Sequence, residues 1–315
     1  MAPRPHADET FLSWLQRLMY ANDLSRDMFL EEIAGERLSP WEIALLGDQL
    51  SDLLLERLSR LCDLEAAAIQ KTLTQGRWWL ALDSFTICCP ACWREDISLS
   101  PEARHTRLSW GNPLLQVCPR HNQALIDLPQ HLGSLHLLQY LSKPEVADTA
   151  YQPSAVQAGT QFLASLDEAL ATLDTDDLGY PPAFRMLEDI MTCFARRFGP
   201  HGSRNTEQEL RFHIADHPRW RESWDYFFGE APLDLLGEGM DAKSGRFHFL
   251  KLERIQVRRL YLLCALYVLG DWGKEPHPVR YCFSKQSWRW LQTQSRTWSP
   301  KHLEQLRPIA QKVAW

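Results

Sequence analysis

The pattern of apolar and polar positions near the start of the chain predicts an amphipathic helix. In ETFLSWLQRLMYAN, residues 9–22, large apolar side chains recur three and four positions apart, which places them on one helical face. These side chains are Phe11, Trp14, Leu15, Leu18 and Met19. Polar residues fall on the opposite face, so we expect this helix to pack against a core through one side only.

Two shorter apolar patterns follow in SDLLLERLSRLCDLEAAAIQKTL, residues 51–73. They predict two short helices joined by a tight turn, with Asp63 as a cap between them, and such a pair resembles a helix-turn-helix. An ordinary helical hairpin has the same pattern. Because no positive charge flanks the pair, DNA contact and simple packing both stay open as interpretations.

The remaining periodic segments are also helical, and strand-like alternation is limited to short pieces such as GRFHFLK, residues 245–251. Helices are predicted over residues 155–173, 182–199, 252–270, 284–295 and 299–315, with Gly199, Gly270, Ser299 and Pro300 at or beside their ends. The predicted fold is mainly α, multi-helical, with helix-turn-helix-like pairs and a small zinc-finger module. A polar, turn-rich segment, PEVADTAYQPSA, places the boundary between a domain of residues 1–148 and a helical C-terminal domain of residues 149–315.

Four of the eight cysteines lie in CCPACWREDISLSPEARHTRLSWGNPLLQVCPRH, residues 88–121. Cys89-Pro-Ala-Cys92 and Cys118-Pro-Arg-His121 are two knuckles of one form, and each offers two ligands at the spacing that suits neighbouring corners of a tetrahedral zinc ion. A redox interpretation of the CxxC motif would not account for Cys118 and His121. The sequence therefore predicts a closed, structural Zn²⁺ site over about residues 85–128. Cys88 could join it through a CxxxC spacing or be a small core residue, and His105 is expected to be no ligand.

Charge is distributed unevenly along the chain. Residues 251–315 carry twelve Lys and Arg against four Asp and Glu, or +8, and the net charge of −6 then leaves −14 for residues 1–250. Only the C-terminal part resembles a nucleic-acid surface, so most of the chain is expected to face protein partners. The candidate nucleic-acid-binding residues on the last helix pair are Lys285, Arg289, Arg296, Lys301 and Lys312. The neighbouring Trp288, Trp290 and Trp298 either stack on bases or belong to the core.

Several function classes lack their signature in this sequence. We find no glycine-rich phosphate loop, nucleophile elbow or HExxH helix, and no HxE that would pair with the CxxC as in zinc deaminases. The longest apolar run, LYLLCALYVLG, is about half the roughly 20 residues that a membrane span needs. The chain begins MAPRPHADET, without a secretory pattern, so a non-enzymatic, cytoplasmic protein without a membrane segment is expected.

The ordered set of motifs resembles the TniQ family. Its members carry an E-S-x-x-SWL-like helix, then CPxC, an R-x-x-W segment and CxxH, which match ETFLSWL, CPAC, RLSW and CPRH here. The resemblance covers roughly residues 1–130. The matching residues are Glu9, Ser13 and Trp14, then Arg107 and Trp110, and the ligands Cys89, Cys92, Cys118 and His121. Many members carry a further CxxC after CxxH, which NQALIDLPQHLGSLHLLQYL lacks, so the resemblance does not carry a second zinc over to this chain.

TniQ-like proteins select targets for transposons that encode a separate transposase and an AAA+ regulator. Some, such as TnsD, bind an attachment site directly, and others join a CRISPR Cascade complex with its guide RNA to the TnsC-like regulator. The acidic first 250 residues and the short chain favour the adaptor over the stand-alone DNA reader, which stays the alternative. The resemblance thus implies the AAA+ regulator, Cascade and target DNA as partners, and a homodimer is left open.

Overall fold

The computed structural model describes residues 2–25, 28–29, 31–32, 46, 50–73, 87–99, 104–112, 114–127, 152–176, 181–198, 222, 226–227, 255–273 and 285–314. Most of these residues are helical, which confirms the predicted mainly α class, and the strands are two residues long. The chain divides into two compact units, Met1–Tyr151 and Gln152–Trp315. The boundary that the sequence predicts between residues 148 and 149 falls outside the described residues, as does the predicted strand at 245–251.

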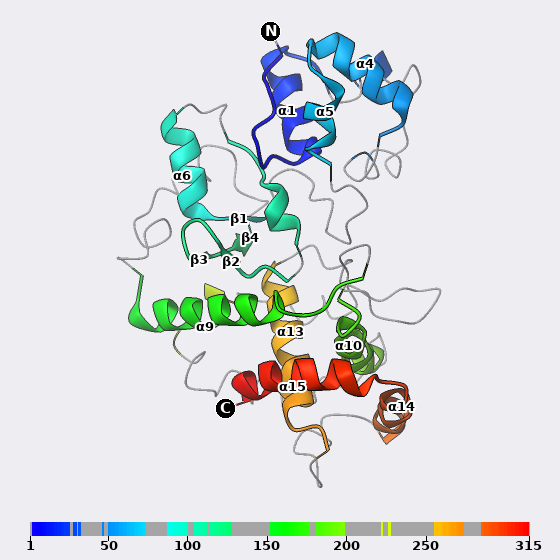
Figure 1. Cartoon of the computed structure of the whole chain (residues 1–315). Helices are drawn as coiled ribbons and strands as arrows, with labels where there is room; N and C mark the ends of the chain where they lie inside the picture. Colours follow the sequence, from blue (N-terminus) through cyan, green and yellow to red (C-terminus); the bar gives the residue numbers. More distant parts are fainter. Residues whose placement is uncertain are drawn as a thin grey trace. The chain divides into compact units, whose positions relative to one another are not determined.

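The first unit begins with the predicted amphipathic helix, α1, Phe11–Ala21 (Figure 1). The Thr10 hydroxyl accepts the Ser13 N–H at 3.3 Å and caps the helix start. All five apolar residues that define the predicted face are buried. Leu12 and Ser13 are buried as well, so the first turn of α1 is covered on all sides. The buried apolar face is confirmed, but the expectation that the helix packs through one side only is wrong for this turn.

A second helix, α4, spans Asp52–Cys62 and is followed by the short α5, Ala66–Gln70, which packs against it (Figure 1). Ser51 caps α4 by accepting the Leu54 N–H. Asp63 ends α4 in a left-handed conformation, φ 51°, and Glu65 is the residue before α5, so Asp63 is a C-cap and not the cap of the second helix. The helix pair exists as predicted. The five residues of α5 carry no charge, which favours packing over DNA reading for this helix.

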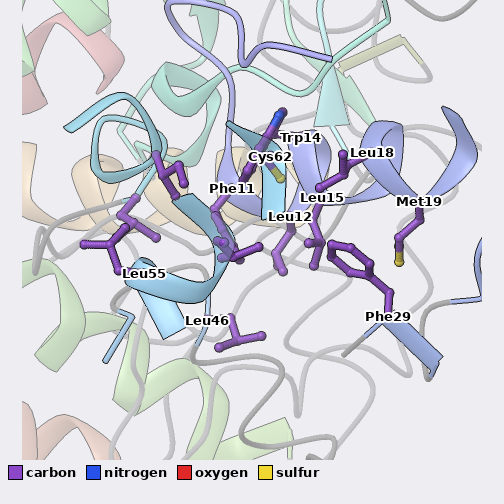
Figure 2. Close-up of a cluster of buried hydrophobic side chains, with 13 residues drawn as sticks. Phe11, Leu12, Trp14, Leu15, Leu18, Met19, Phe29, Leu46, Leu55 and Cys62 are labelled. Atoms are coloured by element: carbon purple, nitrogen blue, oxygen red, sulfur yellow. The ribbon is translucent and has the colours of Figure 1, made fainter. Parts of the chain in front are cut away.

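The buried faces of these helices share one hydrophobic cluster (Figure 2). Trp14 is fully buried, and its indole Nε1 donates a hydrogen bond to the Pro3 carbonyl at 2.8 Å. The apolar part of the ring is therefore removed from water while its one polar group keeps a partner. The cluster contains Phe11, Leu12, Trp14, Leu15, Leu18, Met19, Phe29, Leu46, Leu55, Leu58, Cys62, Ile69 and Leu73. Residues on α1, α4 and α5 therefore stabilise one another as a single helical module.

The cysteine-rich segment folds into two small antiparallel strand pairs and a helix. β1, Ile87–Cys88, pairs with β4, Ile126–Asp127, and β2, Val117–Cys118, pairs with β3, Gln123–Ala124. The helix α6, Pro90–Leu99, follows β1 directly, and a short 3-10 helix, η2, spans Leu108–Gly111. This arrangement places one knuckle at the start of α6 and the other in the hairpin between β2 and β3.

In the second unit, α13, Ile255–Gly270, is the helix on which two others pack, α10, Phe184–Phe198, and α15, Pro300–Ala314. The unit also contains α9, Ser154–Leu170, and α14, Lys285–Ser295. Figure 1 shows α15 crossing α13, and α10 contacts both α13 and α14. The longest apolar run, LYLLCALYVLG, lies in α13, almost all of which is buried.

Two arginines inside α13 are fully buried. Arg259 Nη1 donates to the Phe227 carbonyl at 2.8 Å, and its guanidinium lies 5.5 Å from the Phe227 ring centroid. Arg258 is equally inaccessible. Gly270 is the last residue of α13 and not the residue beyond it. None of the helices in the described ranges combines the length and the hydrophobicity that a bilayer crossing requires.

Candidate metal centre

The two knuckles bring Cys89, Cys92, Cys118 and His121 together. Their ligand atoms all lie within 4.8 Å of one another, and the three cysteines are buried. The Cys92 and Cys118 sulfurs are 3.7 Å apart, and His121 Nδ1 lies 3.2 Å from the Cys92 sulfur. A tetrahedral zinc ion with Zn–S of about 2.3 Å and Zn–N of about 2.0–2.1 Å spaces its ligand atoms about 3.5–3.8 Å apart. The cluster therefore has the size that a tetrahedral metal ion needs.

Local structure explains why the four ligand atoms converge. Cys89 immediately precedes α6, and its carbonyl accepts the Trp93 N–H at 3.1 Å, so Cys92 lies in the first turn of that helix. In the other knuckle, the Cys118 carbonyl accepts the Asn122 N–H at 2.8 Å. Asn122 has a φ of 47°, a left-handed conformation that asparagine tolerates and that closes the turn carrying His121.

Hydrogen bonds within the cluster shift the pKa values of its three thiols. The hydrogen bonds with Cys118 and Cys92, together with burial, raise the pKa of Cys89 far above that of a free thiol. The hydrogen bond with Cys118 raises the pKa of Cys92 to about 12, whereas the bonds from both partners lower the pKa of Cys118. One thiolate is thus stabilised by two neighbouring thiols. A divalent cation among the three sulfurs would stabilise all of them as thiolates, because it supplies the opposite charge.

Two residues that the sequence analysis did not single out complete the surroundings of the cluster. His121 Nε2 lies 2.9 Å from Glu95 Oε1, which orients Nδ1 toward the sulfurs, and Arg120 contacts the other oxygen of Glu95 at 2.7 Å. The hydrogen bond with His121 lowers the pKa of Glu95. Gln123 Oε1 accepts the Ala91 N–H at 3.2 Å and joins the two knuckles. Glu95 could have been found from its spacing, because it follows Cys92 by three positions on one helix.

Two nearby residues, Cys88 and His105, lie outside the ligand group. Cys88 is fully buried in β1 and is not a member of the four-residue ligand group, which favours its interpretation as a core residue. His105 also stands outside the group. Its Nδ1 lies 3.5 Å from Asp96 Oδ2, and its ring stacks on His6 with centroids 4.2 Å apart.

Beside the metal cluster, Arg107 forms a buried ion pair with Asp96 of α6. Arg107 donates from Nη1 and Nη2 to the two Asp96 oxygens at 3.1 and 2.9 Å, and the two side chains are 9% and 7% exposed. Burial alone would lower the pKa of Arg107, but the bonds to Asp96 outweigh it and the pKa is raised. The guanidinium also lies 5.1 Å from the ring centroid of buried Trp110. Asp96 thus links α6, which holds Cys92, to the segment that contains Arg107.

The segment around Arg107 is in turn joined to the start of α1. Glu9 forms an isolated antiparallel bridge with Arg107, and its buried carboxylate accepts two hydrogen bonds from Arg17, at 2.8 and 2.6 Å. Ser13 donates its hydroxyl to Glu9 and accepts the Thr106 N–H at 2.9 Å. The Glu9, Ser13 and Arg107 positions of the motif set therefore meet in one hydrogen-bonded junction between the helical module and the cysteine-rich segment.

The five candidate nucleic-acid residues are all exposed, in the second unit. Lys285 and Arg289 lie on α14, Arg296 lies in the turn that follows it, and Lys301 and Lys312 lie on α15. Lys301 Nζ forms an ion pair with Asp174 at 2.7 Å. Their role in nucleic-acid binding stays a prediction.

Trp288 and Trp298 both pack against Trp272, which follows α13. Trp272 lies 5.5 Å from Trp288 and 5.0 Å from Trp298 between ring centroids, and Trp298 Nε1 donates to Asp189 at 2.9 Å. These contacts favour the core interpretation over base stacking for Trp288 and Trp298.

Comparison with known proteins agrees with the architecture of the first unit. Residues 1–125 match the family model described as TniQ, a span that includes the opening helix, the Glu9–Arg107 junction and all four candidate metal ligands. Searches of curated proteins and of solved structures found no match to the chain. Residues 1–125, less than half of the chain, are therefore similar to TniQ proteins, a family associated with DNA transposition.

Proposed function

We propose that this protein is a non-enzymatic target-selection adaptor for DNA transposition. In this proposal, it links a target-recognition complex, CRISPR Cascade with its guide RNA, to a TnsC-like AAA+ regulator. Recruitment of the regulator raises the local concentration of the transposition machinery at the chosen site. The TniQ domain over residues 1–125 is the observation that carries the proposal.

The surface of the first unit supports protein docking. All six large hydrophobic side chains that are exposed within the described ranges lie between residues 20 and 99. They are Tyr20, Leu24, Met28, Leu53, Leu61 and Leu99, and Tyr20 and Leu99 are 75% and 81% exposed. Leu53 and Leu61 both lie on α4, and exposed apolar side chains that form a continuous patch are typical of surfaces that bind a partner. We place the regulator contact or the Cascade contact on this surface.

The metal ion of the proposed site is zinc, and its role is structural. Three thiolates and an imidazole are a ligand set typical of structural zinc, and the four protein ligands leave no position for a water or a substrate. The Cys89, Cys92, Cys118 and His121 ligands hold α6 against the β2–β3 hairpin, and the Asp96–Arg107 pair passes this order on toward α1. Zinc therefore fixes the domain that presents the docking surface.

Co-purification tests this function. The tagged full chain is expressed with the products of the neighbouring genes, and the eluate is analysed for proteins, metal and nucleic acid. We expect the AAA+ regulator, Cascade proteins with guide RNA, and about one zinc per chain, the number that one Cys₃His set binds. Leu53→Asp with Leu61→Asp should abolish recovery of a partner, and Gln311→Asp, an exposed site in the second unit, should not.

The opposite result is also defined. A purified chain that recovers no protein partner and binds one duplex sequence tightly at physiological salt would replace the adaptor with a stand-alone, TnsD-like DNA-binding protein.

A further inference from the structure

The helix α14 carries cations along a single face. Lys285, Arg289, Gln292 and Arg296 are exposed and follow one another at spacings of four, three and four, which keeps them on one side of the helix as it continues into the turn. Lys285 and Arg289 are separated by about 6 Å along the axis and Arg289 and Arg296 by about 10 Å. We call Lys285, Arg289 and Arg296, with Gln292 between them, the basic face.

Nothing on this element offsets that charge. Residues 285–300 contain no Asp or Glu, and within the described residues Lys285, Arg289 and Arg296 form no ion pair. Lys301, by contrast, is paired with Asp174. Among the residues that the structure describes, the basic face thus differs from Lys301, whose charge is already paired.

The nearest carboxylates of α10 face another side of α14. Glu188 and Asp189 line a cavity of about 620 Å³ together with Gln294, Thr297 and Trp298. Gln294 follows Lys285 by nine positions, or two and a half helical turns, so the two side chains lie on opposite sides of α14. No residue of the basic face lines the cavity. The contacts of Trp288 and Trp298 with Trp272, and the contact of α14 with α10, fix the helix with this face outward.

We propose that the basic face binds the phosphate backbone of nucleic acid. Long cationic side chains with an exposed amide between them match a row of phosphate oxygens, and they make contacts that do not depend on base sequence. The face lies outside residues 1–125, so the TniQ match assigns it no role. The proposal goes beyond the adaptor function and does not rest on it, because weak, sequence-independent binding is compatible with either mode of targeting.

The test measures how affinity depends on salt. The purified, metal-loaded full chain is titrated with a fluorescent random-sequence DNA duplex and, separately, with a single-stranded RNA, between 50 and 200 mM salt. If all three cations contact phosphates, Lys285→Gln with Arg289→Gln and Arg296→Gln should lower the slope of log K against log salt by about 2.7 on duplex or about 2.1 on a single strand. Between 50 and 200 mM salt, a slope that is smaller by 2.7 means that the affinity of the variant falls about 40-fold less than the affinity of the unaltered chain.

A matched variant separates this face from overall charge. Lys71→Gln with Arg185→Gln and Arg307→Gln removes the same charge from exposed positions outside α14 and should leave the slope within about one contact, 0.9, of the unaltered chain. Equal losses from both triple variants, or no loss from the first, would overturn the proposal. A loss confined to duplex or to RNA would support it and identify which nucleic acid the face contacts. Partner recovery in the co-purification experiment is measured independently, so failure of one proposal leaves the other intact.

Discussion

Removal of Asp96 should destabilise the first unit strongly, because it leaves Arg107 as a buried cation without its carboxylate. Two hydrogen bonds of 2.9 and 3.1 Å join the pair, and both side chains are less than one-tenth exposed. Loss of one partner from a buried ion pair costs about 3–5 kcal/mol, far more than the net contribution of the intact pair. We therefore expect Asp96→Ala to lower the free energy of unfolding of the first unit by about 3–5 kcal/mol.

Two controls from the same chain test that reasoning. The exposed pair between Asp174 and Lys301, whose side chains are 53% and 71% exposed, is screened by water and salt, so Asp174→Ala should change the free energy of unfolding little. Replacement of both buried partners, Asp96→Leu with Arg107→Leu, should cost much less than Asp96→Ala, because no isolated charge remains.

Urea unfolding of the zinc-loaded protein measures the difference. Cys62 is a local probe, since it lies in the hydrophobic cluster of the first unit and burial raises its pKa to about 11, which keeps the thiol unreactive until the cluster opens. Its labelling, followed by peptide mapping, should move to a urea concentration lower by about 1 M or more in Asp96→Ala. A shift no larger than that of Asp174→Ala would refute the claim that the buried pair joins α6 to the junction with α1.

Three further changes have defined outcomes. Glu95→Gln should weaken metal binding about 10–100-fold, because the partner that orients His121 loses its charge, and a chelator competition that shows unchanged affinity would contradict this role. Trp14→Ala should lower stability by about 3–5 kcal/mol, and a variant that loses partner recovery at unchanged stability would instead make Trp14 a docking residue. Burial and the neighbouring His105 lower the pKa of His6 below its usual 6.5, so the unfolded chain binds more protons and stability falls as the pH is lowered through that value. His6→Gln should flatten this part of the stability profile at constant metal content, and an unchanged profile would exclude His6 as its cause.

The helices and the metal ligands could be predicted because their signals are local. The apolar spacing of Phe11, Trp14 and Leu18 defines α1, and two identical two-residue gaps define the ligands of the candidate metal site. Asp63 shows that local sequence alone does not decide which helix a capping residue belongs to. An aspartate between two helices can begin the second or end the first, and only its left-handed φ of 51° shows which occurs.

The junction could not be predicted, since its partners are far apart in sequence. Ser13 accepts the Thr106 N–H, and Glu9 pairs with Arg107, contacts that neither periodicity nor composition encodes. Polarity was misleading in α13, where Arg258 and Arg259 interrupt an apolar pattern and are nevertheless fully buried. The motif set named Glu9 and Arg107 without a physical reason, and the structure supplies one: both residues connect the cysteine-rich segment to the helical module.

The most direct test of target selection is the distribution of insertion sites. Transposition is run in cells with the unaltered protein, without it, and with Cys92→Ser, and insertions are mapped by sequencing. We expect insertions to concentrate at the selected site only with the unaltered protein, and the Cys92→Ser variant, which loses a ligand of the proposed zinc site, to behave like the deletion. An insertion distribution that is the same with and without the protein would contradict its role as a target-selection adaptor.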